Sequence, residues 1–450
     1  MLGNKFNNIF IPSDTNGTFF WRAQQQIQSV WALGASTGIN NSVICRPVCD
    51  PKYYEDVDMV MVQRMLSDGQ LNFVEKFLDP YSELLKFWVV YNIDDAMHYQ
   101  DIPKYNRGRR AYVGEKVQEN IRKMLNLSDF VLTTTDYIKS YYNRRYGVPL
   151  ENIIAIPNFL PRWWFGHLYD KQKSIERFKR HKSKGKLRLG IISSLSHFNT
   201  TKCKVDKDGN VVYLDKQDDG SILMVDDNDR IITSDEGLVD VKDDLDIIVD
   251  TIKATVDRFQ WVFLGYCPEA LSEYSKSGKI EVHPGAVITN YPHKLADLDL
   301  DFALAPLVDN EFNRCKSNIK WLETSAVGVP LLASRIDPTY VKYMPENQMF
   351  RDENELMAML KDLQTCSAAR YESMVENQWK FINTPHHECG LDCPSWWLED
   401  CLPHWMKLFK LRPKCSRFSL KKYLGVQKQK EDELSNRIMF SGDNGVMVYK

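Results

Sequence analysis

Residues 312–334 read FNRCKSNIKWLETSAVGVPLLAS, and the pattern of apolar residues changes within this stretch. Apolar residues recur at helical spacing as far as Ala326, and a Gly-Val-Pro turn and a short apolar run follow. This pattern predicts a helix over 316–327 with Ser317 as its N-cap. It also predicts a sharp turn after the helix and a buried strand over 329–334.

Two charged side chains on this predicted helix lie seven residues apart, which is nearly two turns. Lys316 and Glu323 therefore face the same way, separated by roughly 10 Å along the axis. The free backbone N–H groups at the start of the helix favour a phosphate, and Lys316 adds a full positive charge there. Glu323 is placed to accept hydrogen bonds from a pair of sugar hydroxyls. This arrangement suits a nucleotide, and the alternative is an ordinary charged pair on a surface helix.

Predicted strands and helices alternate along the whole chain of 450 residues. The apolar runs that we predict as strands are 7–12, 57–62, 86–93, 129–134, 152–157, 187–193, 259–265, 279–284, 300–307 and 329–334. Helical periodicity is present in 18–33, 113–126, 244–257, 316–327, 355–363, 368–382 and 395–411. The alternation indicates parallel βαβ units, and this length exceeds what one hydrophobic core usually serves. We therefore predict two doubly wound α/β domains.

Composition suggests where these domains begin and end. We predict a first domain over 1–165, a basic linker over 166–186, a second domain over 187–393, and a C-terminal helix and basic tail over 394–450 that pack back on the first domain. Residues 200–243 form an acid-rich insertion with two Asp-Gly turn signals, for which we predict one or two β-hairpins. The insertion is either a solvated surface loop or a flap over the active site.

The opening stretch, together with LDLDFALAPLVDNEFN before it, resembles the donor-binding segment of family-4-like glycosyltransferases, which have the two-Rossmann-domain GT-B architecture. The residues that carry the resemblance are Glu-Thr-Ser-Ala-Val-Gly-Val-Pro over 323–330, with the alanine one place later than in the commonest form. LRLGIISSLSHFN (187–199) resembles the first strand and loop of the second domain, and residues 127–161 resemble the segment that closes the first. Together these segments cover most of 85–335.

The resemblance implies a retaining, metal-independent glycosyltransferase whose donor is a nucleotide-sugar, with uridine diphosphate as the carrier. Glu323 would bind the ribose, and the start of its helix and the 193–197 loop would hold the diphosphate. The family has a further glutamate eight residues before Glu323, where this chain has Cys315. The donor-binding residues that we expect are Ser193, Ser194, His197, Asn313, Lys316, Ser317 and Glu323.

We expect the acceptor side in the first domain, where two aspartates follow the strand over 86–93. The carboxyl end of a strand is where open α/β sheets place ligands, and a carboxylate there can orient or deprotonate an acceptor hydroxyl. The candidate catalytic residues are Asp94, Asp95 and His98, and the candidate acceptor-binding residues are Asp14, Thr18 and Arg22. The alternatives are that the aspartates cap the next helix and that the histidine is structural.

Ten cysteines are scattered along the chain, which favours free thiols in a reducing, cytoplasmic setting. In the stretch HHECGLDC (386–393), His387, Cys389 and Cys393 have a spacing that zinc can use, and a further cysteine and histidine follow closely. The paired CxxC of a structural zinc site is missing. Packed free thiols are therefore the preferred interpretation, and we expect no metal.

Charge and hydropathy bear on the acceptor. The formal net charge is −2, and no apolar run approaches the ~20 residues of a membrane span. Residues 171–188 and 407–430 each carry nine basic side chains, which favours contact with a polyanion. We therefore expect the acceptor to be a hydroxymethylated base in phage DNA, with the protein in the host cytoplasm. The alternatives are a polysaccharide or glycoconjugate acceptor and a non-catalytic nucleotide-sugar-binding protein.

Overall fold

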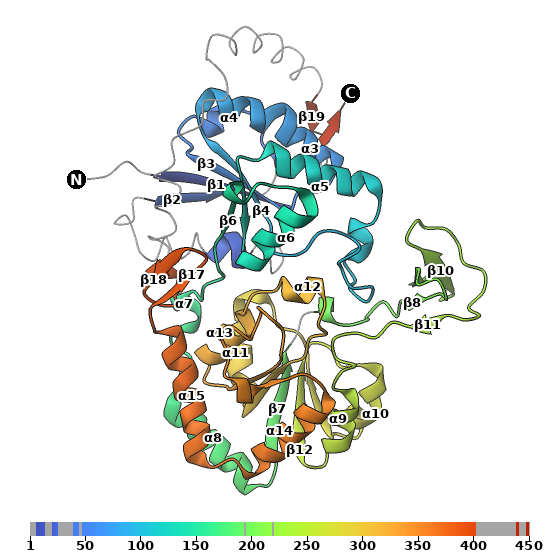
Figure 1. The fold of residues 1–450 in the computed structure, drawn as a ribbon, viewed down its shortest axis with the longest axis vertical. Helices are drawn as coiled ribbons and strands as arrows, with labels where there is room; N and C mark the ends of the chain where they lie inside the picture. Colours follow the sequence, from blue (N-terminus) through green and yellow to red (C-terminus); the bar gives the residue numbers. More distant parts are fainter. Residues whose placement is uncertain are drawn as a thin grey trace.

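The computed structural model describes residues 6–13, 20–25, 39–44, 47–192, 195–217, 220–401, 438–440 and 447–449. Within these residues the chain forms two α/β domains that lie one above the other along the long axis of the molecule (Figure 1). Each domain has a six-stranded sheet at its centre, with helices packed against it. The prediction of two doubly wound domains is confirmed. No helix in the described part of the chain is both long enough and apolar enough to cross a membrane.

All strands of the first sheet are parallel, in the order β2-β1-β3-β4-β5-β6. Their bounds are β1 (Phe6–Pro12), β2 (Ile39–Val43), β3 (Met59–Gln63), β4 (Trp88–Asn92), β5 (Phe130–Thr133) and β6 (Ile153–Ala155). The two faces of β3 pack into different apolar clusters, with Met59 and Met61 in one and Val60 and Val62 in the other. Burial on both faces explains why the central strands read as continuous apolar runs. The sequence of β2, INNSV, has too few apolar residues for that pattern, and this strand was not predicted.

Helices connect these strands, and side-chain caps start several of them. They are η1 (Phe20–Gln24), η3 (Pro51–Tyr54), α3 (Asp68–Phe73), η4 (Val74–Leu78), α4 (Asp79–Leu85), η5 (Arg109–Tyr112), α5 (Glu115–Leu127), α6 (Asp136–Tyr146), η6 (Leu150–Asn152) and α7 (Arg162–Phe165). Ser67 starts α3, because its hydroxyl accepts the backbone N–H of Gln70 while the Gln70 side chain accepts that of Ser67. The Thr135 side chain caps α6, and Gly147 ends this helix in the left-handed conformation, with φ of 72°.

The segment predicted as a basic linker, 166–186, contains a packed helix. α8 (Lys171–Ser183) buries Ile175 and Phe178, which lie three residues apart on one face. These two apolar residues were hidden among the nine basic residues of 171–188, although a spacing of three already places side chains on the same side of a helix. The helix packs against α15 (Ala368–Ile382) of the second domain.

The strands of the second sheet are also parallel, in the order β13-β12-β7-β14-β15-β16. Their bounds are β7 (Leu187–Ile192), β12 (Phe259–Leu264), β13 (Ile280–His283), β14 (Phe302–Ala305), β15 (Leu331–Ser334) and β16 (Met349–Phe350). The helical segments around them are η7 (Leu195–His197), α9 (Val249–Thr255), η8 (Glu269–Leu271), α10 (Ser272–Lys276), η9 (Ile288–Asn290), α11 (Tyr291–Asp297), α12 (Glu311–Arg314), α13 (Ile319–Ala326), η10 (Glu346–Gln348), α14 (Glu353–Thr365) and α15 (Ala368–Ile382). The five strands predicted for this half are all present.

The Gly-Val-Pro turn of the opening stretch connects α13 to β15. Gly328 has φ of 66°, a conformation that favours glycine. A Cβ atom at this position would also lie 2.5 Å from Oγ of Ser174 on α8, which is closer than atoms in contact can approach. Glycine therefore both permits the turn and allows α8 to pack against it. The turn brings the end of α13 directly into a strand whose four residues are all buried.

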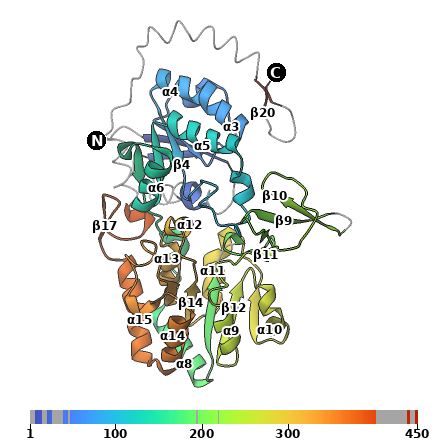
Figure 2. The same cartoon turned by 45° about the vertical axis from the view of Figure 1, so that its right-hand side comes forward.

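The acid-rich insertion forms a separate antiparallel sheet, in the order β10-β9-β8-β11 (Figure 2). Its strands are β8 (Lys204–Val205), β9 (Val211–Lys216), β10 (Ile222–Asp226) and β11 (Val239–Asp240). Arg109 of the first domain forms an ion pair of 3.0 Å with Asp227, and Arg110 pairs with Asp215 at 2.8 Å and with Asp229. The predicted hairpins are present. None of the described residues of 200–243 lines the cavity described below, and the insertion contacts the first domain through these ion pairs.

After α15 the chain returns to the junction of the domains. A hairpin of β17 (His386–Glu388) and β18 (Leu391–Cys393) leads to a short parallel bridge between Leu160 and Trp397. A second hairpin is formed by β19 (Ile438–Phe440) and β20 (Met447–Tyr449). Most of the predicted tail, including the basic residues 407–430, lies outside the described residues.

Candidate active site

A cavity of about 500 Å³ lies between the two domains, at the carboxyl ends of strands from both sheets. The loop after β4 reaches it from the first domain, and the segments after β7, β12 and β14 reach it from the second. The polar and aromatic residues of its wall include Trp21, Asp94, Asp95, Asn158, Ser196, His197, Tyr291, Lys316, Ser317, Lys320, Glu323 and Tyr340. Both the position and the volume are typical of small-molecule sites in open α/β folds.

Glu323 lies on α13 at one end of the cavity, and 2% of its surface is exposed. Its Oε2 accepts a hydrogen bond of 2.7 Å from the Tyr291 hydroxyl and one of 2.8 Å from Nζ of Lys320. Nζ of Lys320 also donates to the Tyr291 hydroxyl at 3.0 Å. The other carboxylate oxygen, Oε1, has no hydrogen-bond partner among the described residues. The arrangement fixes the carboxylate and leaves one strong acceptor available to a ligand.

Tyr291 stays protonated at this position. Burial and then the negative charge of Glu323 raise the pKa of its phenol well above the ordinary value. Tyr291 is therefore a permanent hydrogen-bond donor to Glu323 over the physiological pH range. Neither Tyr291 nor Lys320 was among the predicted site residues. Lys320 is three residues before Glu323 on the same helix face, and this spacing was visible in the sequence.

Lys316 and Ser317 line the cavity, but they precede the helix rather than start it. The predicted helix over 316–327 is wrong at its beginning, because α13 starts at Ile319 and its N-cap is Asn318. Ser317 does not cap it. Its hydroxyl accepts a hydrogen bond of 2.9 Å from Nδ2 of Asn158, across the domain boundary. The loop conformation therefore depends on a partner from the other domain.

Lys316 also reaches across the domain boundary. Its Nζ lies 2.6 Å from Oδ1 of Asp95 and 4.0 Å from the centroid of the Phe312 ring. Arg64, which follows β3, lies 3.7 Å from carboxylate oxygens of both Asp94 and Asp95. Arg64 was not predicted, because nothing in the local sequence shows that the residue after β3 faces the loop after β4.

The two aspartates have opposite pKa shifts. Burial raises the pKa of Asp94, and the neighbouring negative charge of Asp95 raises it further against the effect of Arg64. Burial alone would also raise the pKa of Asp95, but the positive charges of Lys316 and Arg64 outweigh it and hold this pKa below the ordinary value. Asp95 is therefore a stable carboxylate, and Asp94 holds its proton more tightly. The cavity receives one firmly ionised acceptor from the first domain.

His197 lines the cavity and is oriented by a buried carboxylate. Its Nδ1 lies 2.7 Å from Oδ2 of Asp244, which is 1% exposed. Oδ1 of Asp244 accepts three more hydrogen bonds of 2.8 Å, from the Tyr105 hydroxyl, Nδ2 of Asn313 and the backbone N–H of Val308. This network fixes the ring, so that Nε2 is the nitrogen available to a ligand.

Asn313, predicted to contact the donor, belongs to this supporting network. It is completely buried, is not part of the cavity wall, and uses its amide on Asp244 and on the carbonyl oxygen of Val308. Asp244 itself was missed, because it stands at the start of 244–257, which was predicted only as a helix.

Two predicted acceptor-side residues lie elsewhere. His98 is not part of the cavity wall; its ring stacks on Tyr99, with centroids 5.1 Å apart, and faces Asp101. Arg22 is buried and donates to Oδ1 of Asn158 and to backbone carbonyls, so it positions Asn158 rather than facing the cavity. These partners of Arg22 are more than 100 residues away in the sequence, whereas Tyr99 and Asp101 are near neighbours of His98. Asp14, Thr18, Ser193 and Ser194 lie outside the described residues.

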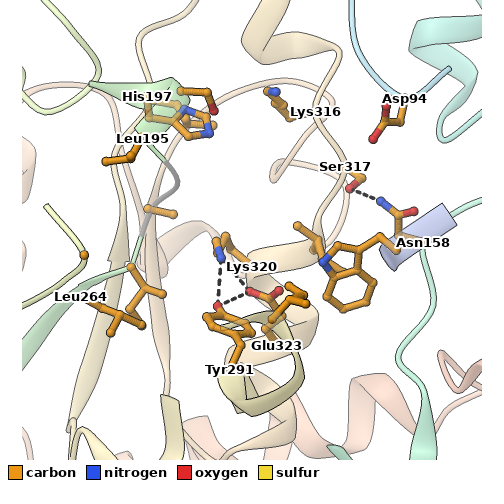
Figure 3. A pocket seen from close by; sticks show the side chains of 18 of the residues that line it. Asp94, Asn158, Leu195, His197, Leu264, Tyr291, Lys316, Ser317, Lys320 and Glu323 are labelled. Atoms are coloured by element: carbon orange, nitrogen blue, oxygen red, sulfur yellow. Dashed lines mark hydrogen bonds and ion pairs between the residues drawn. The ribbon is translucent and has the colours of Figure 1, made fainter. Parts of the chain in front are cut away.

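The ends of the cavity differ in chemistry. Figure 3 shows Glu323, Lys320 and Tyr291 together at one end, and His197, Lys316 and Asp94 at the other. One end thus offers a fixed carboxylate with a free oxygen. The other offers cationic and imidazole nitrogen atoms beside the two aspartates of the first domain.

No protein-family model and no curated protein sequence matches the chain. Solved structures match it in fold. HepE from Anabaena, solved in complex with UDP-glucose, matches with a TM-score of 0.50 and 9% identity, over 95% of this chain and 99% of HepE. A glycosyltransferase from Rickettsia africae ESF-5 matches with a TM-score of 0.48 and 12% identity, over 90% of this chain and 98% of that one. The likeness to HepE concerns the fold, and together with the two parallel sheets it shows that this chain has the GT-B architecture.

Proposed function

We propose that this chain is a glycosyltransferase that binds a nucleotide-diphosphate sugar, with uridine diphosphate as the carrier, in the cavity between its domains. The observation that carries the proposal is the separation of chemistry along the cavity. Glu323 presents an unpartnered carboxylate oxygen at one end, and Lys316 and His197 present nitrogen atoms at the other. A ribose is recognised through hydroxyls that donate to a carboxylate, and a diphosphate through positive charge.

The donor would change the partners of Lys316. In the structure this ammonium group is paired with Asp95. A diphosphate carries more negative charge than one carboxylate, and the first backbone N–H groups of α13 lie next to Lys316 to assist in binding it. We propose that Lys316 turns from Asp95 to the diphosphate when the donor enters. Lys320 and Tyr291 stay with Glu323 and keep the ribose end fixed.

Transfer forms a bond between the acceptor oxygen and the anomeric carbon of the sugar, and it breaks the bond from that carbon to the diphosphate. Positive charge at Lys316 stabilises the departing diphosphate, and we propose that no metal ion is required for this. Asp95, once released by Lys316, is the carboxylate that accepts a hydrogen bond from the acceptor hydroxyl and takes up its proton as the new bond forms. We propose that the anomeric configuration is retained.

For the acceptor we propose a hydroxymethylated base in DNA. The support is the basic composition of residues 407–430, together with the exposed Lys173 and Lys179 of α8 and Lys184 directly after it. α8 supports this proposal less than its composition suggested, because Arg177 is buried. Several of its other basic groups have partners within the protein, such as Asp299 for Arg180 and Glu376 for Lys171. A polysaccharide or glycoconjugate acceptor remains the alternative.

The test measures transfer of a radiolabelled sugar from a panel of UDP-sugars without added metal. The acceptor arms are DNA with hydroxymethylated bases, the same DNA without the hydroxyl, and lipid-linked and soluble glycans. Transfer to any hydroxyl-bearing arm supports a glycosyltransferase, and the arm that is labelled identifies the acceptor class. Tight donor binding without transfer to any arm and without donor hydrolysis would instead indicate a nucleotide-sugar-binding protein.

A further inference from the structure

The hairpin of β17 and β18 brings a histidine and a cysteine to the same face. The two strands pair antiparallel, with His386 opposite Cys393 and His387 opposite Asp392. Residues directly opposite each other share a face, and neighbours along a strand alternate between faces. His387 and Asp392 are therefore on the other face, where they are exposed and joined by a hydrogen bond of 2.8 Å.

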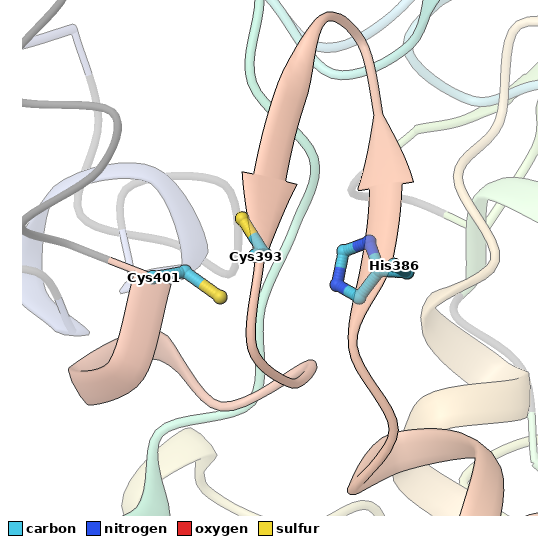
Figure 4. Close-up of side chains that lie close together, drawn as sticks. All are labelled: His386, Cys393 and Cys401. Carbon is cyan, nitrogen blue, oxygen red and sulfur yellow. The ribbon is translucent and has the colours of Figure 1, made fainter.

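Cys401 joins His386 and Cys393 from the helical residues 398–401 (Figure 4). One potential ligand atom from each of the three side chains lies within 4.8 Å of the other two. Both cysteines are buried, with 2% of Cys393 and 0% of Cys401 exposed. Ligand atoms around a tetrahedral zinc ion stand about 3.5–3.8 Å apart, so an ion would draw these groups together by about 1 Å.

The hydrogen bonds within this cluster are those that a bound ion would replace. The carbonyl oxygen of Ser395 accepts from Nε2 of His386 at 2.9 Å and from Sγ of Cys401 at 2.8 Å. On binding zinc, the Cys401 thiol would lose its proton to solvent, and His386 would coordinate the ion through a ring nitrogen that carries no hydrogen. The ring of His386 is fixed by stacking on Trp396, with centroids 4.1 Å apart. The ligand set is thus partly arranged before any ion enters.

We propose that His386, Cys393 and Cys401 bind one zinc ion. Two thiolates and one imidazole are soft ligands that suit zinc and exclude magnesium and calcium, which require oxygen. Three protein ligands leave the fourth tetrahedral position to water. The sequence-based interpretation used the spacing of His387 and rejected zinc because no paired CxxC is present. Antiparallel pairing supplies the proximity that a CxxC motif supplies locally.

The ion would fasten the chain where it passes back to the junction of the domains. The backbone N–H of Leu160 donates to the carbonyl oxygen of Trp396, and that of Leu398 donates to the carbonyl oxygen of Leu160. These bonds lie between the hairpin and Cys401, so the ion would close the loop that contains them. None of the three ligands lines the cavity between the domains. The ion would therefore lie outside the proposed donor site, and the proposal is independent of the glycosyltransferase activity.

The experiment uses the full-length protein without a histidine tag, purified in the presence of a reducing agent. We expect one zinc per chain by mass spectrometry of the elements. After a chelator removes the zinc, titration with Co²⁺ should give the absorption of tetrahedral cobalt and a thiolate charge-transfer band, with an end point at one equivalent. The metal-free protein should unfold at a temperature several degrees lower, and Zn²⁺ should restore it.

Cys393→Ser and Cys401→Ser should each lose the stoichiometric zinc, with a charge-transfer band at half intensity or less. The matched controls are His387→Asn, one residue from a ligand but on the other face, and Cys366→Ser, a buried thiol outside the cluster; both should keep the metal. The proposal is wrong if the reduced wild type gives no thiolate band with Co²⁺, or if fresh protein contains a disulfide between Cys393 and Cys401. The wild-type measurements need no variant to fold.

Discussion

Nζ of Lys316 lies 2.6 Å from Oδ1 of Asp95, and this ion pair joins the two domains across the cavity. Lys316 belongs to the loop before α13, and Asp95 follows β4. The side chains are 20% and 19% exposed, so the pair is partly protected from solvent. The proposed donor phosphate and the carboxylate thus compete for the same ammonium group, which gives the two residues opposite effects on donor binding.

Asp95→Asn should slow sugar transfer without weakening the binding of the donor. The variant removes the carboxylate that holds Lys316 in the empty cavity, so the donor no longer has to displace it. We expect the Kd for UDP to stay the same or to fall, while kcat falls at least tenfold through loss of the carboxylate at the acceptor. Isothermal titration with UDP and the labelled-sugar assay measure the two quantities. A higher Kd for UDP would place Asp95 in the donor site instead.

Lys316→Met should, in contrast, weaken the binding of the donor. The variant keeps most of the side-chain volume but loses the charge, and a hydrogen bond to a charged group contributes ~1.5–3 kcal/mol, or about 10- to 100-fold in Kd. The control is Lys361→Met, an exposed lysine on α14. If UDP and uridine weaken to the same degree in Lys316→Met, Lys316 does not contact the phosphates.

Glu323→Gln should weaken UDP binding by about 10- to 100-fold, because a carboxylate that accepts from two hydroxyls becomes a neutral amide. Glu323→Gln nearly preserves shape, so a loss of affinity reports on charge rather than on packing. The control is Glu273→Gln on α10, where the glutamate is exposed and outside the cavity wall. Binding of 2′,3′-dideoxy-UDP gives the sharper test. This ligand should bind Glu323→Gln and wild type with similar affinity, and a remaining difference would contradict the contact with the ribose.

Some of these strands and site residues could be predicted from the sequence, and others could not. β3, β4 and β14 could be predicted because they are buried on both faces and are apolar except for Gln63 and Asn92, which end β3 and β4. Glu323 could be proposed from its place on a helix before the Gly-Val-Pro turn. The start of that helix could not be placed correctly, since Ser317 is an ordinary N-cap residue and its actual partner, Asn158, comes from the other domain.

The residues that the sequence missed are joined by long-range contacts. Tyr291 is 32 residues from Glu323 along the chain, and Asp244 is 47 residues from His197. Their proximity follows from the strand order of the second sheet, in which β7 lies between β12 and β14. Periodicity shows which face of an element is buried, but it does not show which polar side chains meet at the ends of neighbouring strands.

Asp94→Asn should stabilise the protein at neutral pH. Because the folded pKa of Asp94 lies above its unfolded value, the folded state binds this proton more tightly, and the ionised carboxylate opposes folding at pH 7. This opposition disappears as the pH falls toward the unfolded pKa near ~3.9. The Tm of Asp94→Asn should therefore exceed that of wild type at pH 7, and the difference should shrink toward pH 4.

Asp95→Asn should have the opposite effect and destabilise the protein at neutral pH. The folded pKa of Asp95 is depressed, so its stabilising contribution is present above the unfolded pKa and is lost as the pH falls through the folded pKa. This variant should have a lower Tm than wild type at pH 7. Thermal unfolding of both variants and wild type at pH 4 and pH 7 decides the matter, and shifts of the same sign at pH 7 would contradict the assigned pKa directions.

The pair of Arg109 and Asp227 should hold the insertion against the first domain. The two side chains are 8% and 23% exposed, and Asp227 also accepts a hydrogen bond of 2.7 Å from the Tyr213 hydroxyl within the insertion. Because this ion pair is partly buried, we expect a double-mutant cycle with Arg109→Ala and Asp227→Ala to give a coupling energy of about 1 kcal/mol. Hydrogen exchange of the β9 amides should accelerate in each single variant, since release of the sheet from the first domain exposes it to local opening.

The matched control is the pair of Glu119 and Lys123, which lies within α5 and is more exposed, at 50% and 43%. A surface pair four residues apart on a helix contributes about 0.3–0.5 kcal/mol, so its coupling should be smaller and the β9 amides should be unaffected. Equal coupling in the two pairs would mean that the acidic insertion is a solvated surface sheet. Stronger coupling across the domains, together with faster exchange in β9, would mean that its negative charge serves to attach it to the first domain.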